Sequence, residues 1–437
     1  MEKHLPDVLA WLFEADPLDD RAVETRARQL FLDTLGCMIA GMAKPSPRKL
    51  GVALWRIEPG PVTLTGVSGS FSVSAGAYLA GLAACWDEAC EGLPRAHGRP
   101  GLHSFAAALP LALQRNATLG ETLTALVAGY EVAGRLGAVL RIKPGMHVDG
   151  TWGTFGAATA AARLMGLSPE ITMQALRGAA CQLPWSLYLP IQQGADIRNA
   201  YVGEAARRGI MQVLAAAADI GAPVGAIEVF NELALGAAND ASLLVDSGEW
   251  LLLEGYLKPF AAVRHVHYGA QAAIDWRRGA DNPDSRHIQS LTLSIYGEAL
   301  TYCGNRAPVT PIQAQFSLSY GLASALVRGD LGPEAYDANA LRDSEVRRLE
   351  ALVSLVEDPV LTLNNERAAT LTVMTKESLE TITASQLPGD PGFPLTTARV
   401  EAKFLRYSTP IIGADRAAEI ASAVLNGPLS TPLNGIV

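Results

Sequence analysis

The chain has 437 residues, 49% of them hydrophobic, and its 35 Lys and Arg against 44 Asp and Glu give a net charge of −9. A chain of this length can bury a large core and favours two or three domains. The basic residues are scattered and do not form a stripe with aromatic residues, which excludes nucleic acid as the expected partner.

The sequence also bears on membranes and on the redox compartment. No apolar run reaches the roughly 18 residues that a membrane span requires, so we expect no membrane partner. The N-terminal segment MEKHLPDVLAWLFEADPLDD has no basic region followed by an uninterrupted apolar one, so we expect no signal peptide and a cytoplasmic protein. Five cysteines without a CxxC motif fit reduced, mostly buried thiols.

Helical periodicity extends from the N-terminus to about residue 260. The first long apolar face begins after two aspartates and has a natural stop at Gly41. Thr118 and Glu121 form a capping box, and Ser168 with Pro169 opens another helix. Segments as rich in Ala and Gly as GTFGAATAAARLMG allow neighbouring helices to approach closely, which predicts a dense helical bundle.

The pattern changes near residue 287, where IQSLTLSIYGEAL has the alternation of a half-buried strand. LTLNNERAATLTVMT repeats that signal at about 360–374, and PVTPIQAQFSLSYGLASALV and SEVRRLEALVSLV are helical between them. After PGDPGFPL the tail returns to helical periodicity. We therefore expect a mostly α fold, with a large helical domain at 1–267 and 391–437 and a smaller α+β domain at 268–390.

The segment from Cys85 to Phe105 is unusually polar for its surroundings, because it lies between two apolar, small-residue helices. It carries Asp87, Glu88, Glu91, Arg95, His97, Arg99 and His103. Titratable groups in or beside a core are often retained for chemistry, so this loop is a predicted site.

Several stretches resemble the MmgE/PrpD family, whose members include 2-methylcitrate dehydratase, cis-aconitate decarboxylase and iminodisuccinate epimerase. They are RQLFLDTLGCMIAG, the polar segment above, HVDGTWGTFGAATAAARLMGL, DIRNAYVGEAARRGI, KPFAAVRHVH, AQFSLSYGLA and VEAKF. Their order and spacing cover nearly the whole chain. The resemblance implies a helical domain with an inserted α+β lid, a homodimer, and a cofactor-independent active site in the cleft between the domains.

The resemblance also implies site residues. Asp87 matches the first aspartate of a DxDDT-like motif, and His103 matches the histidine of the HP motif that follows. His147 precedes the glycine-rich helix start, and Lys258 of KPF and Tyr320 of FSLSY match two further cleft positions. These five residues are the predicted catalytic set.

The chain departs from the family pattern at several of these motifs. DxDDT is here DEACE, and HP is His103 followed by Ser104. Arg198 stands where many members have a lysine, and Tyr201 stands in place of a histidine. These changes alter the hydrogen bonds to a substrate and the set of proton carriers, so they do not favour methylcitrate dehydration.

Moving a proton at a carbon next to a carboxylate requires an acid/base pair and a cationic clamp. Histidine titrates near neutrality, which favours His103 and His147 for proton transfer; the alternative is a hydrogen-bonded histidine at a helix end. Lys258, Arg264 and Arg198 are the predicted clamp, since guanidinium and ammonium groups hold carboxylates; the alternative for each is a surface cation.

The remaining candidates have weaker signals. Tyr320 is either a phenolic donor or a core residue, and Asp87 either orients a histidine or pairs with a nearby arginine. Glu91, if it faces the cleft, would repel a third carboxylate, so we hypothesise a substrate less anionic than a tricarboxylate. Thr151 and Tyr201 complete the predicted substrate-binding set, Thr151 because GTWGTFG opens a helix that can present N–H groups to an anion.

We expect no metal and no cofactor. His265 and His267 would point to the same side of an extended segment, but no third ligand has suitable spacing. Neither a P-loop nor a GxGxxG motif after a strand is present, so a nucleotide is not expected.

Three functions follow from these patterns and the resemblance. The first is a lyase, a dehydratase or decarboxylase, that acts on a small carboxylic acid. The second is an isomerase or epimerase that exchanges a proton alpha to a carboxylate. The third is a catalytically inactive binding relative, which the altered DxDDT motif suggests and the joint presence of His103, His147, Lys258 and Tyr320 disfavours.

Overall fold

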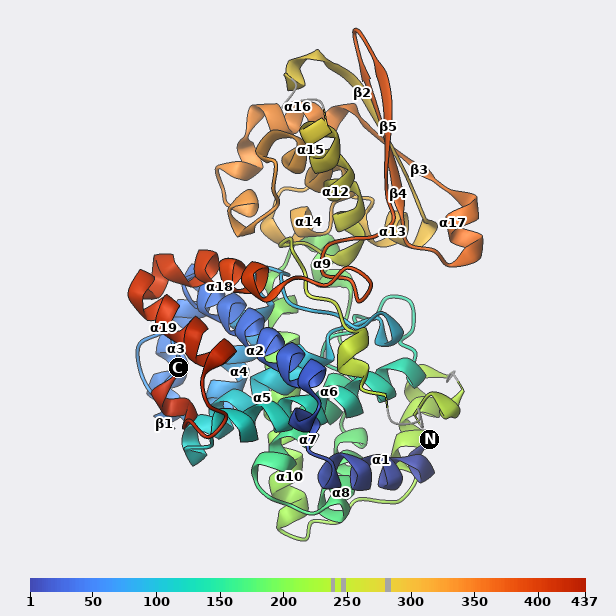
Figure 1. Ribbon diagram of the computed structural model, residues 1–437. Coiled ribbons are helices and arrows are strands. Elements are labelled where there is room, and N and C mark those ends of the chain that lie inside the picture. Colours follow the sequence, from blue (N-terminus) through green and yellow to red (C-terminus); the bar gives the residue numbers. More distant parts are fainter. Residues whose placement is uncertain (237–239, 245–248, 280–283) are drawn as a thin grey trace.

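The computed structural model describes residues 1–236, 240–244, 249–279 and 284–437. Helices dominate, as predicted, and a large helical part lies below a smaller α+β part in Figure 1. Within the described residues, no helix combines the length and apolar character needed to cross a bilayer.

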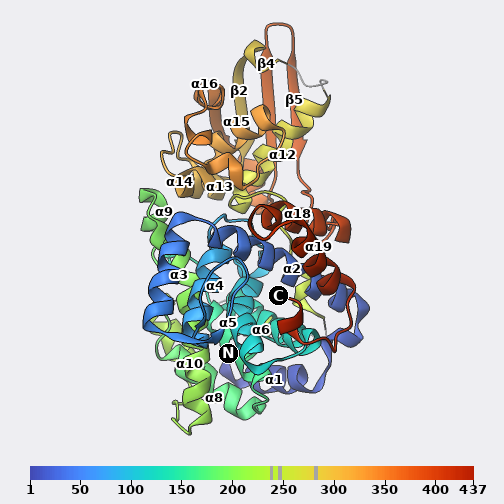
Figure 2. The same cartoon turned by 90° about the vertical axis from the view of Figure 1, so that its left-hand side faces the viewer.

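The helical part is formed by the first half of the chain and by its end. Its helices are α1 (Leu5–Glu14), α2 (Arg21–Met42), α3 (Pro45–Ile57), α4 (Val73–Cys85), α5 (Pro100–Arg115), α6 (Leu119–Val139), α7 (Gly153–Leu164), α8 (Pro169–Ala180), α9 (Leu189–Gln193), α10 (Ala200–Ala217), α11 (Ala226–Phe230), α18 (Thr397–Ile412) and α19 (Ala414–Asn426), with a short strand β1 (Pro59–Val62). Figures 1 and 2 both place α18 beside α2, and Lys403 of α18 pairs with Asp33 of α2 at 2.6 Å.

Small residues determine how closely these helices pack. A Cβ on Gly203 of α10 would lie 2.1 Å from the Tyr78 carbonyl oxygen of α4, and one on Gly41 of α2 would lie 1.9 Å from that of Ala83. The missing side chain of Gly41 therefore permits a close helix crossing. Gly41 was predicted to stop this helix, but it lies inside α2, which ends at Met42. The predicted dense bundle is confirmed, as are the capping box that starts α6 and the serine cap of α8.

The α+β part is formed by α12 (Arg264–Gly279), β2 (Ile288–Ile295), α13 (Gly297–Cys303), α14 (Pro311–Gln315), α15 (Leu318–Arg328), α16 (Ser344–Leu352), β3 (Val353–Glu357), α17 (Pro359–Asn364), β4 (Ala369–Thr375) and β5 (Leu379–Ala384). Its described strands form a sheet in the order β3-β2-β4-β5. β2 is parallel to β3 and antiparallel to β4, and β4 and β5 form an antiparallel pair. Helix α12 packs against α15 and against β4 and β5.

Two local predictions in this part are wrong, and one strand was not predicted. The helix predicted over SEVRRLEALVSLV ends at Leu352, and β3 follows, because Val353 pairs with Leu291 of β2. LTLNN is not a strand; it belongs to α17, whose N-terminus is capped by the Asp358 carboxylate. The edge strand β5 was not predicted, because its side chains are mostly exposed and show no apolar alternation.

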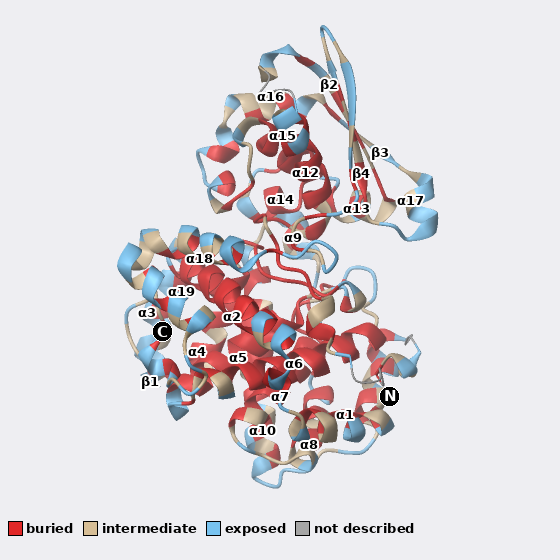
Figure 3. Ribbon diagram, viewed as in Figure 1, coloured by how far each residue is buried: buried red, intermediate tan, exposed pale blue. Residues whose placement is uncertain are grey.

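Buried residues concentrate in two places. Figure 3 shows them filling α2, α5, α6 and α7, and also the linking segments between the helical and the α+β parts. Three such segments meet at this junction: the loop at 86–99, the loop at 145–152 and the link at 256–264. They carry the site.

Candidate active site

Glu88 lies at the centre of three buried cations. Its Oε1 accepts a hydrogen bond from Lys258 Nζ at 2.6 Å, and its Oε2 accepts from Arg99 Nη1 at 3.1 Å and from Arg198. Glu88 is 3% exposed and has a left-handed backbone with φ of 52°. Burial alone would raise the pKa of Glu88, but Arg198, Arg99 and Lys258 together hold it well below the ordinary range.

Asp149 extends this charged centre. Arg99 pairs with both Glu88 and Asp149, and Arg198 Nη2 lies 3.7 Å from Asp149 Oδ2. Burial opposes ionisation of Asp149, yet Arg99 and neighbouring cations lower its pKa. With Lys258, the centre holds three cations and two carboxylates, so it keeps a net positive charge that suits an anionic ligand.

His147 lies at the edge of the charged centre in a neutral form. The Asp149 backbone N–H donates to Nδ1 at 3.0 Å, which places the proton of the neutral imidazole on Nε2. Burial lowers the pKa of His147 to about 4, against the opposing effect of the Asp149 carboxylate. The ring stacks on Tyr188 with centroids 6.1 Å apart.

His265 faces the same space from the α+β part. It lies in the first turn of α12, and its Nδ1 is 2.6 Å from the Tyr296 hydroxyl. Burial lowers the pKa of His265 to about 3. The segment is helical and not extended, so His265 and His267 do not point to one side; His267 Nε2 is bonded to the Ala262 carbonyl instead. The premise of the HxH metal interpretation was therefore wrong.

Arg264 offers an unused donor. Its guanidinium pairs with Asp390 and lies 4.4 Å from the ring centroid of Tyr256, while Nη1 has no hydrogen-bond partner. The residue is 5% exposed and lines the charged cavity. An unsatisfied buried guanidinium donor is energetically costly, so this position suits a ligand carboxylate.

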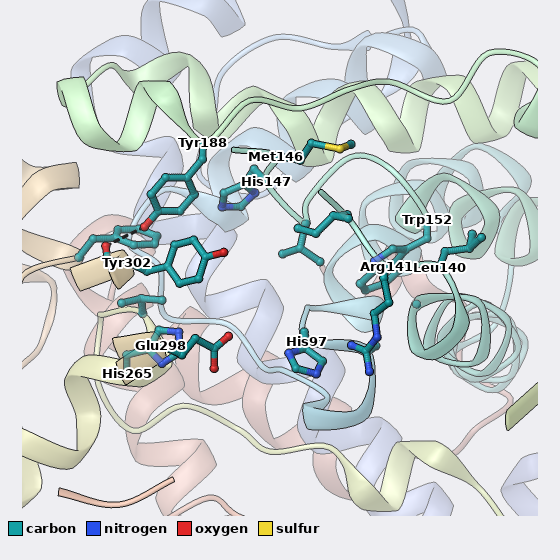
Figure 4. A pocket seen from close by; sticks show the side chains of 16 residues that line it. His97, Leu140, Arg141, Met146, His147, Trp152, Tyr188, His265, Glu298 and Tyr302 are labelled. Carbon is teal, nitrogen blue, oxygen red and sulfur yellow. Dashed lines mark hydrogen bonds between the residues drawn. The ribbon is translucent and has the colours of Figure 1, made fainter. Parts of the chain in front are cut away.

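Two adjacent cavities with shared lining residues occupy the junction. The charged one, of about 110 Å³, is bordered by Glu88, Lys258 and Arg264, and a second one, of about 300 Å³, extends beside it. His147 and His265 line both. Figure 4 shows His147 on one side of the larger cavity and His265 with Glu298 on another.

Three predicted residues lie behind the cavity wall. His103 is fully buried; its Nδ1 contacts the Arg99 carbonyl at 2.9 Å and its Nε2 accepts from Gly150 N–H at 3.1 Å, so both ring nitrogens are engaged. Thr151 donates to the Pro184 carbonyl, and Tyr201 donates to a carbonyl while packing against His147. His103 thus holds the Gly150 turn in place without bordering either cavity.

Asp87, Glu91 and Tyr320 also lie outside the two cavities. Asp87 pairs with Lys44 at 2.9 Å. Glu91 accepts from the Leu102 N–H, and burial raises its pKa to about 8, so it is neutral at pH 7 and does not repel a substrate carboxylate. The Tyr320 hydroxyl donates to the Ala335 carbonyl at 2.6 Å. The site therefore unites His147, Lys258, Arg198 and Arg264 of the predicted set.

Sequence reasoning did not select three charged residues that the centre uses. Glu88, Arg99 and Asp149 were in or near the noted segments, but nothing in the local pattern distinguished Glu88 from Asp87. His265 was considered only as a metal ligand. Within the described residues, no group of three or more His, Cys, Asp or Glu is arranged to hold a metal ion.

Comparisons with known proteins add independent findings. A model of the MmgE/PrpD N-terminal domain matches residues 9–234, and one of the MmgE/PrpD C-terminal domain matches residues 260–427. The chain is 24% identical to a cis-aconitate decarboxylase-like protein, oryM, of Aspergillus oryzae, over 95% of this chain and 92% of the relative. It is 24% identical to a cis-aconitate decarboxylase of Aspergillus terreus (69% and 67%) and 26% identical to that of Mus musculus (60% and 57%).

Proposed function

Because the chain belongs to the MmgE/PrpD family, we propose that it is a lyase, a dehydratase or decarboxylase, acting on a small carboxylic acid. The observation that carries the proposal is the pair of imidazoles, His147 and His265, which reach one cationic cavity from different parts of the fold. The similarity to cis-aconitate decarboxylases supports the same reaction class.

The substrate carboxylate binds at the cationic wall. Arg264 has a free Nη1 donor, and Lys258 Nζ has used two of its three protons on Glu88. Burial lowers the pKa of Lys258, whereas Glu88 opposes that change and favours the ammonium form. These two groups bind the carboxylate and stabilise the charge that develops on it when the adjacent carbon loses a proton or CO₂.

The imidazoles move and position the proton. His147 presents Nε2–H, because its Nδ1 accepts from the backbone, so it donates a hydrogen bond to the developing oxyanion or to the leaving hydroxyl. His265 presents an unprotonated Nε2 when its Nδ1–H donates to the Tyr296 oxygen. In a dehydration, His265 takes the carbon-bound proton and passes it to the departing hydroxyl, which His147 Nε2–H holds by a hydrogen bond, and water leaves.

The proposal is tested by proton NMR of the protein in D₂O with a panel of di- and tricarboxylic acids and their hydroxy derivatives. A lyase produces new alkene signals or releases CO₂. The rate at which the substrate signals disappear should be strongly reduced in His147→Asn. His287→Asn, at an exposed histidine outside the cavity, is the matched control and should retain activity. Conversion that is equally fast in His147→Asn would contradict the proposal.

An epimerase is the second candidate, because imidazoles on different walls of one cavity also suit removal and return of a proton on opposite faces of a carbon. The same experiment separates the two functions. Incorporation of deuterium at the carbon next to a carboxylate, without alkene or CO₂, selects the epimerase and rejects the lyase.

A further inference from the structure

The cavity beside the charged centre is the larger of the two and has a mostly apolar wall. It measures about 300 Å³, against about 110 Å³ for the charged cavity. Leu140, Ile142, Met146 and Trp152 contribute to its lining. They come from the end of α6, the following loop and the residue before α7, and Figure 4 shows Leu140, Met146 and Trp152 around it. A single carboxylate does not need this space.

The two cavities are adjacent and share part of their walls around the imidazoles. Val148, Val263 and Phe316 line both of them, together with His147 and His265. One ligand can therefore occupy both cavities, with its reacting carbon at the imidazoles and its two ends in different environments. The charged cavity accepts the carboxylate, and the larger cavity accepts the substituent on the other side of the reacting carbon.

The charges on the larger cavity do not favour a second carboxylate there. Apart from histidines, the charged side chains among its described lining residues are Arg141 and Glu298. Glu298 also lies 3.3 Å from Arg367, so the negative charge is held in place. One cation and one anion give no net attraction for an anion, and a carboxylate taken from water without a dedicated partner is costly to bury.

We propose that the substrate is a carboxylic acid with an uncharged apolar substituent of several carbons, and that this substituent fills the cavity lined by Leu140, Ile142 and Trp152. The proposal rests on the proposed function for the reaction itself, but it makes a separate claim about binding. Since one water occupies about 30 Å³ of liquid, 300 Å³ has room for roughly ten non-hydrogen atoms.

The test is calorimetric titration of the unmodified protein with 2-alkylsuccinates that carry methyl, propyl, pentyl and heptyl chains. Tricarballylate, which has a third carboxylate in place of the alkyl chain, is the comparison ligand. Affinity should rise about fourfold for each buried methylene until the cavity is full. Affinity independent of chain length, tightest binding by tricarballylate, or no binding by any member overturns the proposal.

A cavity-filling variant locates the alkyl chain. Ile142→Trp places a larger side chain into the apolar cavity at a partly exposed position, so it should abolish the advantage of the heptyl over the methyl compound. Ile220→Trp, at a residue that is 65% exposed and outside both cavities, should retain it. Equal length dependence in the two variants contradicts the placement. Length-dependent binding of the alkylsuccinates, with no turnover of any acid in the NMR panel, would reject the lyase and leave this inference standing. Turnover of an acid from that panel, with alkylsuccinate binding that does not depend on chain length, would reject this inference and leave the lyase standing.

Discussion

Replacement of Glu88 by glutamine removes the shared anion of three buried cations. The carboxylate is 3% exposed and lies 2.6 Å from Lys258 Nζ and 3.1 Å from Arg99 Nη1, with Arg198 as its third partner. At about 3 Å and an effective dielectric constant of about 20, the attraction between Glu88 and one cation is about 5 kcal/mol. The lost hydration of the buried ions offsets much of the summed attraction of the three pairs. We expect Glu88→Gln to lower the free energy of unfolding by about 3–5 kcal/mol, because the cations stay buried without their partner.

The assay is urea denaturation at pH 7, followed by circular dichroism. Glu204→Gln is the matched control, since Glu204 pairs with Arg208 one helical turn away and both are about 40% exposed; it should cost less than about 1 kcal/mol. The Glu88 carboxylate has a lowered pKa, so its contribution is complete above the ordinary value of about 4.3 and is lost as the pH falls toward the folded-state value. Equal, small losses in the two variants would refute the assigned role of Glu88.

Two further predictions concern stability. Burial lowers the pKa of His147 to about 4, whereas an unfolded histidine has a pKa of about 6.5, so between these values the unfolded chain binds the proton first. On going from pH 6.5 to pH 5 the wild type should therefore lose about 1.6 kcal/mol more stability than His147→Asn, and equal losses in urea titrations would contradict this. Gly203→Ala should destabilise the protein by about 1–3 kcal/mol, since the new Cβ would lie 2.1 Å from a carbonyl oxygen of α4, whereas Gly221→Ala meets nothing within 4 Å. Thermal denaturation of the two variants side by side tests this, and similar midpoints would count against the close helix crossing.

Local sequence signals were sufficient for much of the helical part. The Thr118–Glu121 capping box and the Ala/Gly-rich helices act through contacts along or between helices, and these are readable from spacing. The strands were harder, because β3 owes its conformation to pairing with β2, far away in the sequence, and the edge strand β5 has no buried face. The helix α17 was hidden in a segment rich in β-branched and apolar residues.

The sequence indicated which segment carries the site, but it did not indicate which of its side chains face the cavity. The polar loop was predicted to turn through or beside the core, and most of its charged residues are buried. The left-handed backbone at Glu88 turns that carboxylate toward Lys258, while Asp87 pairs with Lys44. Neighbouring residues in a turn point in different directions, and sequence spacing does not reveal which one faces a cavity. His103 matched a family position, yet both of its ring nitrogens are engaged by backbone groups.

Proton transfer by His265, with the hydrogen bond that His147 donates, is tested most directly by turnover of the best acid from the panel in three variants. His147→Asn and His265→Asn should each reduce kcat at least about 100-fold, the usual scale of a lost general acid or base, while His287→Asn should retain the wild-type rate. Full activity in either of the first two variants would contradict the assignment of that imidazole to the chemistry.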